Sequence, residues 1–326
     1  MYDIRSSLSN IMLQKKGICR SQSYENLRGE KGQAAQTASI LGKSRKGTPF
    51  RLDLQPEEVF TLADIEGKGV IRQFFITVTD QKENGPDVLE KLIVRMYWER
   101  EEIPSVECPL GAFFCCGHRK IVMTDMEPWA KGRKHTVGWG SMPVRAMSNH
   151  SPIIIVPARS FHCYLPMPFN THAKITIENC YGAAVSVVAY QVTYTLEQSE
   201  WKYAHFHAKY VRCTWKSDMG ELFLHKILSQ ENGTYAGIYL SARQAGKECS
   251  INPLLKITAS SDLAKSEDIW YEPVSGDDLK NGCWSSFSME IQIQFKGGLE
   301  LSLVPFYDTI SAETEFDCAV YWYLGI

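Results

Sequence analysis

The sequence predicts an all-β protein with two tandem antiparallel β-jelly-roll domains and a short N-terminal helix. Three observations lead to this fold class: many short segments alternate apolar and polar residues, irregular segments separate them, and one arrangement of strands occurs twice. Alternation with a period of two is the signal of a strand with one buried face, whereas helical patterns repeat about every 3.6 residues. Antiparallel strands joined by irregular connections are typical of jelly rolls.

The repeated arrangement occupies Ser160–Leu196 and Met289–Leu324. Each copy contains a corner aromatic residue, a short alternating strand, a loop and a long closing strand. Phe169 and Phe295 mark the equivalent corners, which places the two copies 126 residues apart along the chain. Solenoid units repeat about every 20–50 residues, so a spacing this long indicates a duplicated domain.

The chain of 326 residues is long enough for two hydrophobic cores. We expect an N-terminal helix and polar loop over residues 1–49, a first jelly roll over 50–197 and a second over 201–326. The boundary between the two jelly rolls falls at Glu197–Glu200.

The expected elements follow from local patterns along the chain. A helix is expected over residues 2–14, because Ile4, Leu8 and Met12 recur on one face. Residues 119–150 have little pattern, and so long a loop predicts a position near a site or a subunit contact. The clearest strands are Val70–Val78, Leu92–Trp98, Trp201–Trp215 and Tyr235–Leu240, the last following a hairpin signal at Asn232-Gly233.

The two closing strands have equivalent apolar faces. In the first half the alternation places one set of side chains on the same face: Val188, Tyr190, Val192, Tyr194 and Leu196. In the second half the equivalent positions are Val320, Trp322 and Leu324.

Composition excludes some partners. A net charge of −2 gives no electrostatic footprint for nucleic acid or an anionic membrane. The N-terminus has no signal-peptide core, and there are nowhere 18 consecutive apolar residues, so neither membrane insertion nor export is expected. The ten cysteines are scattered through apolar contexts such as Cys180, Cys213 and Cys318, as expected for small hydrophobic residues in a reducing compartment. We therefore expect a cytoplasmic protein.

Candidate metal and nucleophile sites are weak. His205 and His207 alternate on one strand as in a cupin metal site, but no carboxylate follows them, so a hydrogen-bonded structural role is favoured. The vicinal Cys115 and Cys116 are too close for ordinary zinc chelation. There is also no phosphate-binding glycine loop, nucleophile elbow or metalloprotease motif. We expect no metal and no cofactor, which leaves carboxylate pairs, sufficient for hydrolysis of a glycosidic bond.

One irregular polar segment is a candidate binding loop. Residues 19–32 contain two glycines and no periodicity, and a solvated surface loop is the commoner explanation for such a segment. Its polar side chains are Arg20, Ser23, Glu25, Asn26 and Lys31.

Several motifs together resemble glycoside hydrolase family 172, in the right order over almost the whole chain. They are Ser21–Gly32, Pro109–Phe114 with Gly117-His118, Cys163–Phe169 with Ile175–Asn179, Phe206–Tyr210 with Arg212, and Ala319–Tyr323. The resemblance implies tandem jelly rolls, a homotrimer or a hexamer of two trimers, and a pocket completed at subunit contacts. It also implies a retaining two-glutamate enzyme acting on a small furanoside sugar or oligosaccharide, such as an α-D-fructofuranoside, a difructose dianhydride or a D-arabinofuranoside.

By the order of the family motifs, Glu248 corresponds to the nucleophile and Glu267 to the acid/base, 19 positions later. The expected sugar contacts are Asp268, His207 and the polar loop with Arg20, Ser23, Glu25, Asn26 and Lys31. Trp270 is a candidate for stacking on the sugar ring, although a core position is the commoner explanation for a tryptophan.

Two functions stay open, because this chain lacks the glycines and paired tryptophans of the family's Trp-Trp-Gly-Glu-Gly and Gly-Thr-Gly-Thr-Glu-Asp-Tyr-Phe segments. One is a retaining furanosidase. The other is a non-catalytic jelly-roll assembly or sugar-binding protein. The two functions can be distinguished by the distance between the carboxyl groups of Glu248 and Glu267. In a retaining enzyme these groups lie about 5 Å apart in one pocket.

Overall fold

The computed structural model describes residues 17–34, 52–78, 88–115, 154–155, 160–198, 200, 202–216, 218–244, 253–261, 264–271, 283–288, 293–305 and 313–325. The helix expected at residues 2–14 and the loop at 119–150 lie outside them. The described residues form two β-sheets and two four-residue helices, α3 (Val88–Lys91) and α4 (Leu110–Phe113), so the all-β prediction is confirmed. Neither of these helices has the length or apolar character needed to cross a membrane.

The smaller sheet has seven strands and belongs to the first half of the chain. Its order is β1-β11-β4-β8-β7, with β2 pairing with β11 and β9 pairing with β4. The strands are β1 (Gly17–Ser23), β2 (Leu52–Leu54), β4 (Gly69–Val78), β7 (Ile154–Ile155), β8 (Ser160–Cys163), β9 (Met167–Phe169) and β11 (Val185–Glu197).

The larger sheet has eleven strands and runs through both halves. Its order is β15-β14-β17-β13-β18-β12-β6-β5-β10-β3, and β16 pairs with β13. The first-half strands are β3 (Val59–Glu66), β5 (Leu92–Trp98), β6 (Val106–Pro109) and β10 (His172–Asn179). The second-half strands are β12 (His205–Trp215), β13 (Leu222–Gln244), β14 (Pro253–Ser261), β15 (Ala264–Tyr271), β16 (Cys283–Ser288), β17 (Ile293–Pro305) and β18 (Thr314–Leu324).

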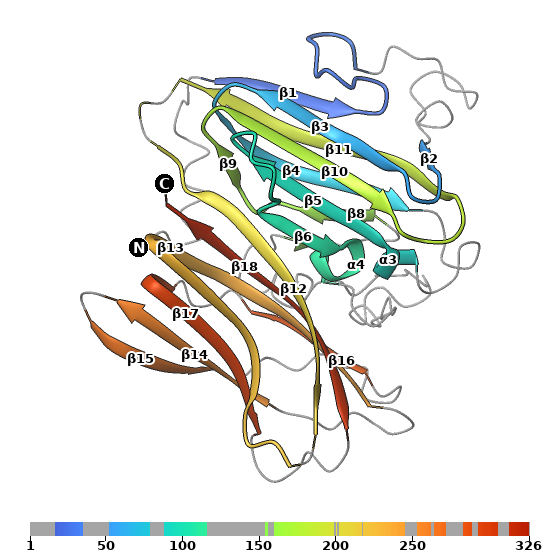
Figure 1. Ribbon diagram of the computed structural model, residues 1–326. Helices are drawn as coiled ribbons and strands as arrows, with labels where there is room; N and C mark the ends of the chain where they lie inside the picture. Colours follow the sequence, from blue (N-terminus) through green and yellow to red (C-terminus); the bar gives the residue numbers. More distant parts are fainter. Residues whose placement is uncertain are drawn as a thin grey trace, which may run out of the picture.

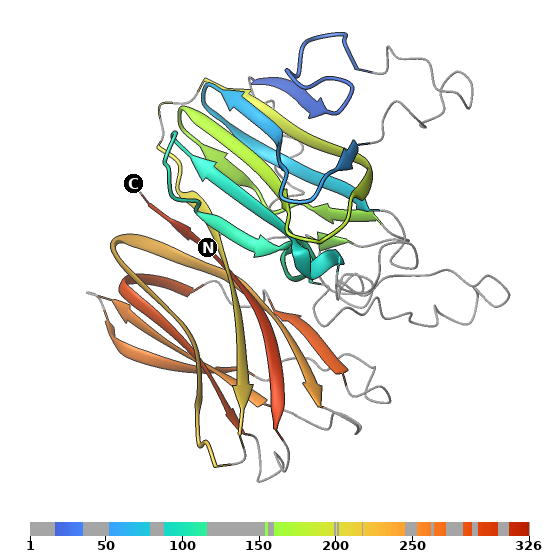
Figure 2. The same cartoon turned by 45° about the vertical axis from the view of Figure 1, so that its right-hand side comes forward.

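The first half is a sandwich of the smaller sheet and the β3-β10-β5-β6 part of the larger one (Figures 1 and 2). One core fills it, with Phe74 and Val192 from the smaller sheet and Val94 and Ile175 from the larger. The consecutive strands β10 and β11 lie in opposite sheets, because β10 pairs with β3 and β5 while β11 pairs with β1 and β4. This placement of consecutive strands in facing sheets is the jelly-roll pattern.

The alternation on β11 shifts once. The register against β4 jumps between Val187 and Ala189, so Val187 is buried before the irregularity and Tyr190, Val192 and Tyr194 after it. A second jump, between Thr193 and Tyr194, places the extra residue on β4 and leaves the alternation of β11 unchanged. The shared buried face expected for Tyr190, Val192 and Tyr194 is confirmed, while Leu196 is half-buried and the side chain of Val188 lies outside the described ones. A bulge of this kind re-aims every later side chain on the strand.

The second half contains a second core and is lined by strongly curved strands (Figures 1 and 2). Its longest strand, β13, changes partners along its length: residues 222–235 pair with β17, and residues 233–244 pair with β18. The hairpin expected at Asn232-Gly233 is therefore wrong, since β13 passes through both residues. Glycine serves a packing role there, because a Cβ at Gly233 would lie 2.1 Å from Cζ of Phe295.

The strands β12, β18 and the second part of β13 form a layer shared by the two halves. On β18, Cys318, Val320 and Trp322 belong to the second core, whereas Ala319 and Tyr321 belong to the first. The strand β12 also pairs in parallel with β6, so the larger sheet is continuous across the boundary expected at residues 197–200. Burial on both faces explains why β18 reads as a continuous apolar run.

A hydrogen bond from this layer caps α4 of the first half. The hydroxyl of the fully buried Tyr321 donates to the carbonyl oxygens of Phe113, at 2.9 Å, and of Ala112, at 3.3 Å. The last carbonyl groups of a helix have no partner within it, so a donor from elsewhere is needed in a dry core.

We therefore expect Tyr321→Phe to lower the free energy of unfolding by about 1–3 kcal/mol, because the Phe113 carbonyl loses its donor inside the core. Urea unfolding measures this change. The matched control is Tyr97→Phe on β5, whose hydroxyl has no hydrogen bond to any residue that the structure describes. Equal losses in the two variants would contradict the capping role.

Candidate functional site

A pocket lies beside the edge strand β1 and the loop that follows it. The strand β1 is at the top of Figure 1. Its volume is about 290 Å³. The strand β1 supplies one side because it pairs with β11 along its whole length, from Gly17 to Ser23. The lining residues are Cys19, Arg20, Ser21, Asn26, Gly29, Glu30, Lys31, Gly32, Ala34, Gln191 and Thr193.

Asn26 and Gly29 fix the shape of the loop. The side-chain amide of Asn26 donates to the carbonyl of Glu30 and accepts from the N–H of Glu30, both at 3.0 Å. Gly29 has a φ of +64°, and a Cβ there would lie 2.6 Å from the hydroxyl oxygen of Tyr194. Asn26 therefore holds the loop closed, and only glycine fits the close approach to Tyr194.

Gln22 anchors β1 to the larger sheet, a role that the sequence pattern did not suggest. Its side-chain amide donates to the carbonyl of Asp64 and accepts from the N–H of Asp64, both at 2.8 Å. Asp64 lies on β3, the edge strand of the larger sheet, where backbone groups need partners. Gln22 is 2% exposed, and because its burial is visible only in the structure the sequence offered no signal for this role.

The charges of the pocket are not balanced within the described chain. Arg20 donates to the neighbouring carbonyl of Cys19, at 2.9 Å, and neither Arg20 nor Lys31 forms an ion pair with a described residue. Glu30 is the single carboxylate of the lining, and Arg28 lies 3.9 Å from it. The pocket therefore offers cationic donors beside the hydroxyl groups of Ser21 and Thr193.

The structure brings together three of the five loop residues selected from the sequence. Arg20, Asn26 and Lys31 line the pocket. Ser23 ends β1 opposite Gln191, outside the lining. Glu25 lies in the turn after β1, and its Oε2 is buried without a hydrogen bond to the described residues.

The glutamate segment lies elsewhere. On β15, Glu267 is opposite Ala259, Asp268 is opposite Thr258 and Trp270 is opposite Lys256. Figures 1 and 2 show β15 and β1 at opposite ends of the molecule. Within one chain the loop and these three positions are not neighbours. Glu248 lies outside the described residues, so the distance between its carboxyl group and that of Glu267 stays a prediction.

His207 is packed in an aromatic stack. Its ring lies 5.4 Å from that of Trp322 with 11° between the planes, and His225 contacts the same tryptophan from 5.8 Å. Burial, and the nearby His205, lower the pKa of His207 to about 4. His205 instead hydrogen bonds to Glu99, at 2.9 Å, so the two histidines have different partners.

Glu99 is a largely buried carboxylate whose oxygens are fully used. It accepts from the N–H groups of Asn170 and Thr171, from the Thr171 hydroxyl and from His205. Burial alone would raise the pKa of Glu99, but these hydrogen bonds outweigh it and hold the pKa below its usual value. The Glu99 carboxylate therefore connects β5, the turn before β10 and the start of β12. Its oxygens have no free acceptor position with which to bind a substrate.

Asp64, Glu66 and His172 form a possible cation cluster, with their ligand atoms within 4.8 Å of one another. Metal-bound histidines normally donate their other ring N–H to an acceptor. The buried Nδ1 of His172 has no such partner among the described residues, so the cluster is better explained by the hydrogen bond from His172 to Asp64, at 2.7 Å.

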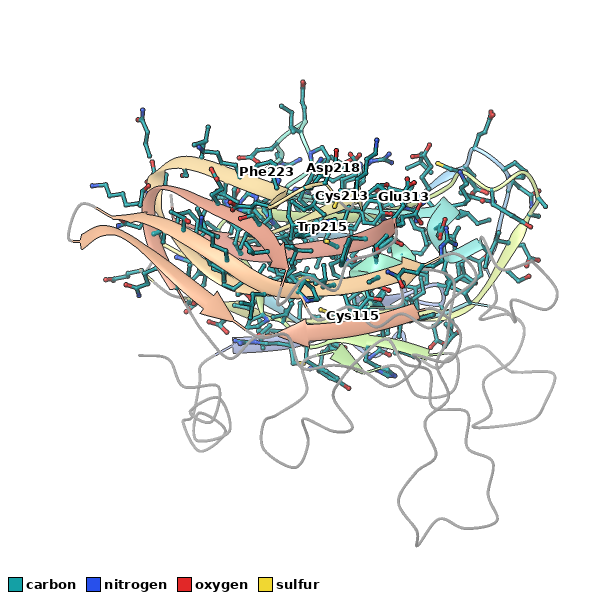
Figure 3. The ribbon with its side chains drawn as sticks, turned by 90° about the horizontal axis from the view of Figure 1, so that it is seen from below. Cys115, Cys213, Trp215, Asp218, Phe223 and Glu313 are labelled. Atoms are coloured by element: carbon teal, nitrogen blue, oxygen red, sulfur yellow. The ribbon has the colours of Figure 1, made fainter. Side chains whose placement is uncertain are left out.

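Figure 3 shows the second half from below, where β12 ends. Trp215 is buried at this end, and Phe223, at the start of β13, is 53% exposed. Glu313 directly precedes the residue that pairs with Trp215, and Asp218 lies in the turn between β12 and β13. The thiol of Cys213 hydrogen bonds to that of Cys318, which lowers the pKa of Cys213. These groups have no arrangement that suggests a reaction.

The fold and the family comparison together define the class: a jelly-roll protein of glycoside-hydrolase-like type. Residues 45–145 match a family model described as GH172 domain-like. The match covers about a third of the chain, and over this segment the resemblance noted in the sequence is confirmed. None of the site residues selected from the sequence lies within the matched segment.

Solved structures give distant similarities. The major capsid protein P2 of bacteriophage PM2 is 6% identical with a TM-score of 0.42, over 85% of this chain and 97% of that one. The Sulfolobus turreted icosahedral virus structure is 9% identical with a TM-score of 0.42, over 84% of this chain and 90% of that one. Similarities of this size support no transfer of function. No curated protein matches the sequence.

The stacked His207 predicts a pH-dependent stability. Below the ordinary histidine pKa of about 6.5, His207 is protonated in the unfolded chain, whereas in the folded chain it stays neutral down to about pH 4. We expect the free energy of unfolding to fall by about 1–3 kcal/mol as the pH drops through this window. Urea unfolding at several pH values should show that His207→Phe, which keeps a ring on Trp322, removes this part of the dependence. Parallel pH profiles for the two proteins would contradict it.

Proposed function

We propose that the protein binds a small furanose-containing sugar in the pocket beside β1. The observation that carries this proposal is that Arg20, Asn26 and Lys31 line one pocket in a protein with a GH172-like segment. A volume of about 290 Å³ is close to the lower end of small-molecule pockets.

The lining has the chemistry that a sugar needs. Each sugar hydroxyl both donates and accepts hydrogen bonds, and the side chains of Ser21, Thr193 and Gln191 do the same. Arg20 and Lys31 add donors that meet no opposite charge in the described chain. Asn26 acts by holding the loop, since its amide is bonded to Glu30.

We expect isothermal titration calorimetry to detect binding of fructofuranosides or arabinofuranosides, and Arg20→Ala or Lys31→Ala to weaken it about tenfold. The matched control is Arg28→Ala, because Arg28 lies on the same loop outside the pocket lining with its side chain 86% exposed. A wild-type protein that binds no furanose sugar refutes the proposal. So does an Arg28→Ala variant that is weakened as much as the pocket variants.

The second candidate function is retaining hydrolysis of a furanoside by Glu248 and Glu267. It is supported by the GH172 match and by the spacing of 19 residues between these glutamates. In such a reaction an ionised Glu248 attacks the anomeric carbon, while Glu267 holds a proton for the departing oxygen. Asp268 and Trp270 would then contact the sugar.

Hydrolysis at a site that also uses the β1 loop requires a neighbouring subunit. The loop and β15 lie at opposite ends of one chain, so they meet only if a second copy supplies one of them. We propose a homotrimer, or a hexamer of two trimers, for this reason and from the family resemblance.

For the enzyme we expect Glu248→Gln to abolish turnover of nitrophenyl furanosides, because an amide cannot form the glycosyl-enzyme. Glu267→Ala should slow substrates with poor leaving groups far more than nitrophenyl substrates, whose leaving group departs without protonation. If the wild-type protein binds furanosides but hydrolyses none, the enzyme is refuted and the non-catalytic sugar-binding or assembly function is supported. If light scattering shows a monomer, a site shared between subunits is refuted.

A further inference from the structure

A strip of uncharged polar and aromatic side chains leads from the pocket across the outer face of the smaller sheet. We call these side chains the strip, and its members are Gln191, Thr193, Gln73, Phe75, His162 and Tyr164. The register connects them: on β11 and β4, Thr193 is opposite Gln73 and Gln191 is opposite Phe75. On β4 and β8, Phe75 is opposite His162. Gln191 and Thr193 also line the pocket, so the strip begins there.

Direct contacts join the members of the strip. Gln191 donates to the hydroxyl of Thr193, at 3.0 Å. The amide nitrogen of Gln73 lies 3.1 Å from the hydroxyl of Tyr164 and 3.2 Å from Nδ1 of His162. These bonds hold the planar groups in place, which lowers the entropy that a ligand must overcome.

The rings of the strip form a short platform. The ring of His162 lies 4.7 Å from that of Phe75 and is stacked on that of Tyr164 at 6.1 Å with 8° between the planes. The alternate residues Phe74 and Phe161 point into the core, so period-two geometry puts the platform on the outer face. Tyr164, directly after β8, is 39% exposed.

Charged side chains on the smaller sheet lie beyond the strip, where Arg72 pairs with Glu197 and donates to the hydroxyl of Thr195, at 2.8 Å. The outer face of the opposite sheet, in the same half of the molecule, also carries ion pairs. There Arg95 pairs with Glu107, at 3.3 Å, and with Glu178. Ion pairs between charged side chains are ordinary for a solvated strand face. The strip has no formally charged member near pH 7, since burial lowers the pKa of His162 and keeps its ring neutral. Aromatic enrichment with depletion of charge marks a contact surface.

We propose that the strip extends the pocket into a binding surface for a neutral oligosaccharide, whose further sugar units pack against the His162–Tyr164 platform. The apolar C–H face of a sugar ring buries area against an aromatic ring, and its hydroxyl edge bonds to side-chain amides such as those of Gln73 and Gln191. From β11 to β8 the strip crosses two strand spacings, about 10 Å, which is longer than one sugar ring. This inference rests on the proposed sugar binding at the pocket.

The test is calorimetry with furanose sugars of increasing length, from a monosaccharide glycoside to fructo-oligosaccharides and arabinofuranosyl oligosaccharides. We expect affinity to rise with chain length in the wild-type protein. Tyr164→Ala should weaken the binding of the longer sugars by about three- to tenfold and leave the monosaccharide unchanged. Tyr164→Phe, which keeps the ring, should retain most of the gain.

The matched control is Tyr97→Ala, a half-buried tyrosine on the outer face of the opposite sheet, which should bind every sugar like the wild type. Near-ultraviolet circular dichroism confirms that each variant is folded. Two results would refute the role of the strip without refuting the pocket. One is equal affinity of the wild-type protein for short and long sugars, and the other is unchanged affinity of Tyr164→Ala for the longer sugars. Absence of binding for every sugar overturns the pocket and the strip together.

Discussion

The burial of β18 on both faces is the constraint on which the rest of the structure depends. A strand that serves two cores must keep one register, because a slip of one residue would exchange the side chains of the two cores. The register is held by a buried charge: Asp317, 1% exposed, accepts two hydrogen bonds from Arg212 on β12, at 2.6 and 3.0 Å, and one from Tyr210, at 2.7 Å. The Arg212 side chain is 38% exposed, but its removal would leave the buried Asp317 carboxylate without its cation, so the pair favours one register.

The position of the pocket depends on the same layer through a short chain of contacts. The pairing of β12 with β6 places the first half of the larger sheet, and its edge strand β3 holds β1 through the amide of Gln22. The side chain of Asn26 then closes the loop after β1 through its two hydrogen bonds to the backbone of Glu30. Rigid sheet edges with a closed loop between them suit a preformed site.

The sequence was sufficient for strands whose pattern is local. Leu92–Trp98 alternates clearly and forms β5 with the same bounds, and the strand expected at Val70–Val78 is β4 extended by one residue. The hairpin at Asn232-Gly233 failed because the same glycine that suits a turn also suits a close approach, in this case by Phe295. Only the partner strand distinguishes these two uses.

The candidate site shows the same limit. The polar segment identified in the sequence contains Arg20, Asn26 and Lys31, which do line one pocket. No local pattern connects Gln191 to Phe75 and His162, because their contact depends on the order of strands in the sheet. For the same reason the sequence could not show that the loop and β15 lie at opposite ends of one chain.

The two candidate functions differ in what they require from the carboxylates. The carboxylates of Glu99 and Asp317, which lie largely out of water, have their oxygens occupied by donors that hold the fold together. An acid/base group needs the opposite environment, in which burial raises the pKa and an acceptor position stays open for the substrate. Among the described residues, the lining of the pocket beside β1 contains one carboxylate, Glu30, which lies 3.9 Å from Arg28. Sugar binding can therefore rest on the described residues of the pocket, whereas hydrolysis there needs a second carboxylate that the described lining does not contain.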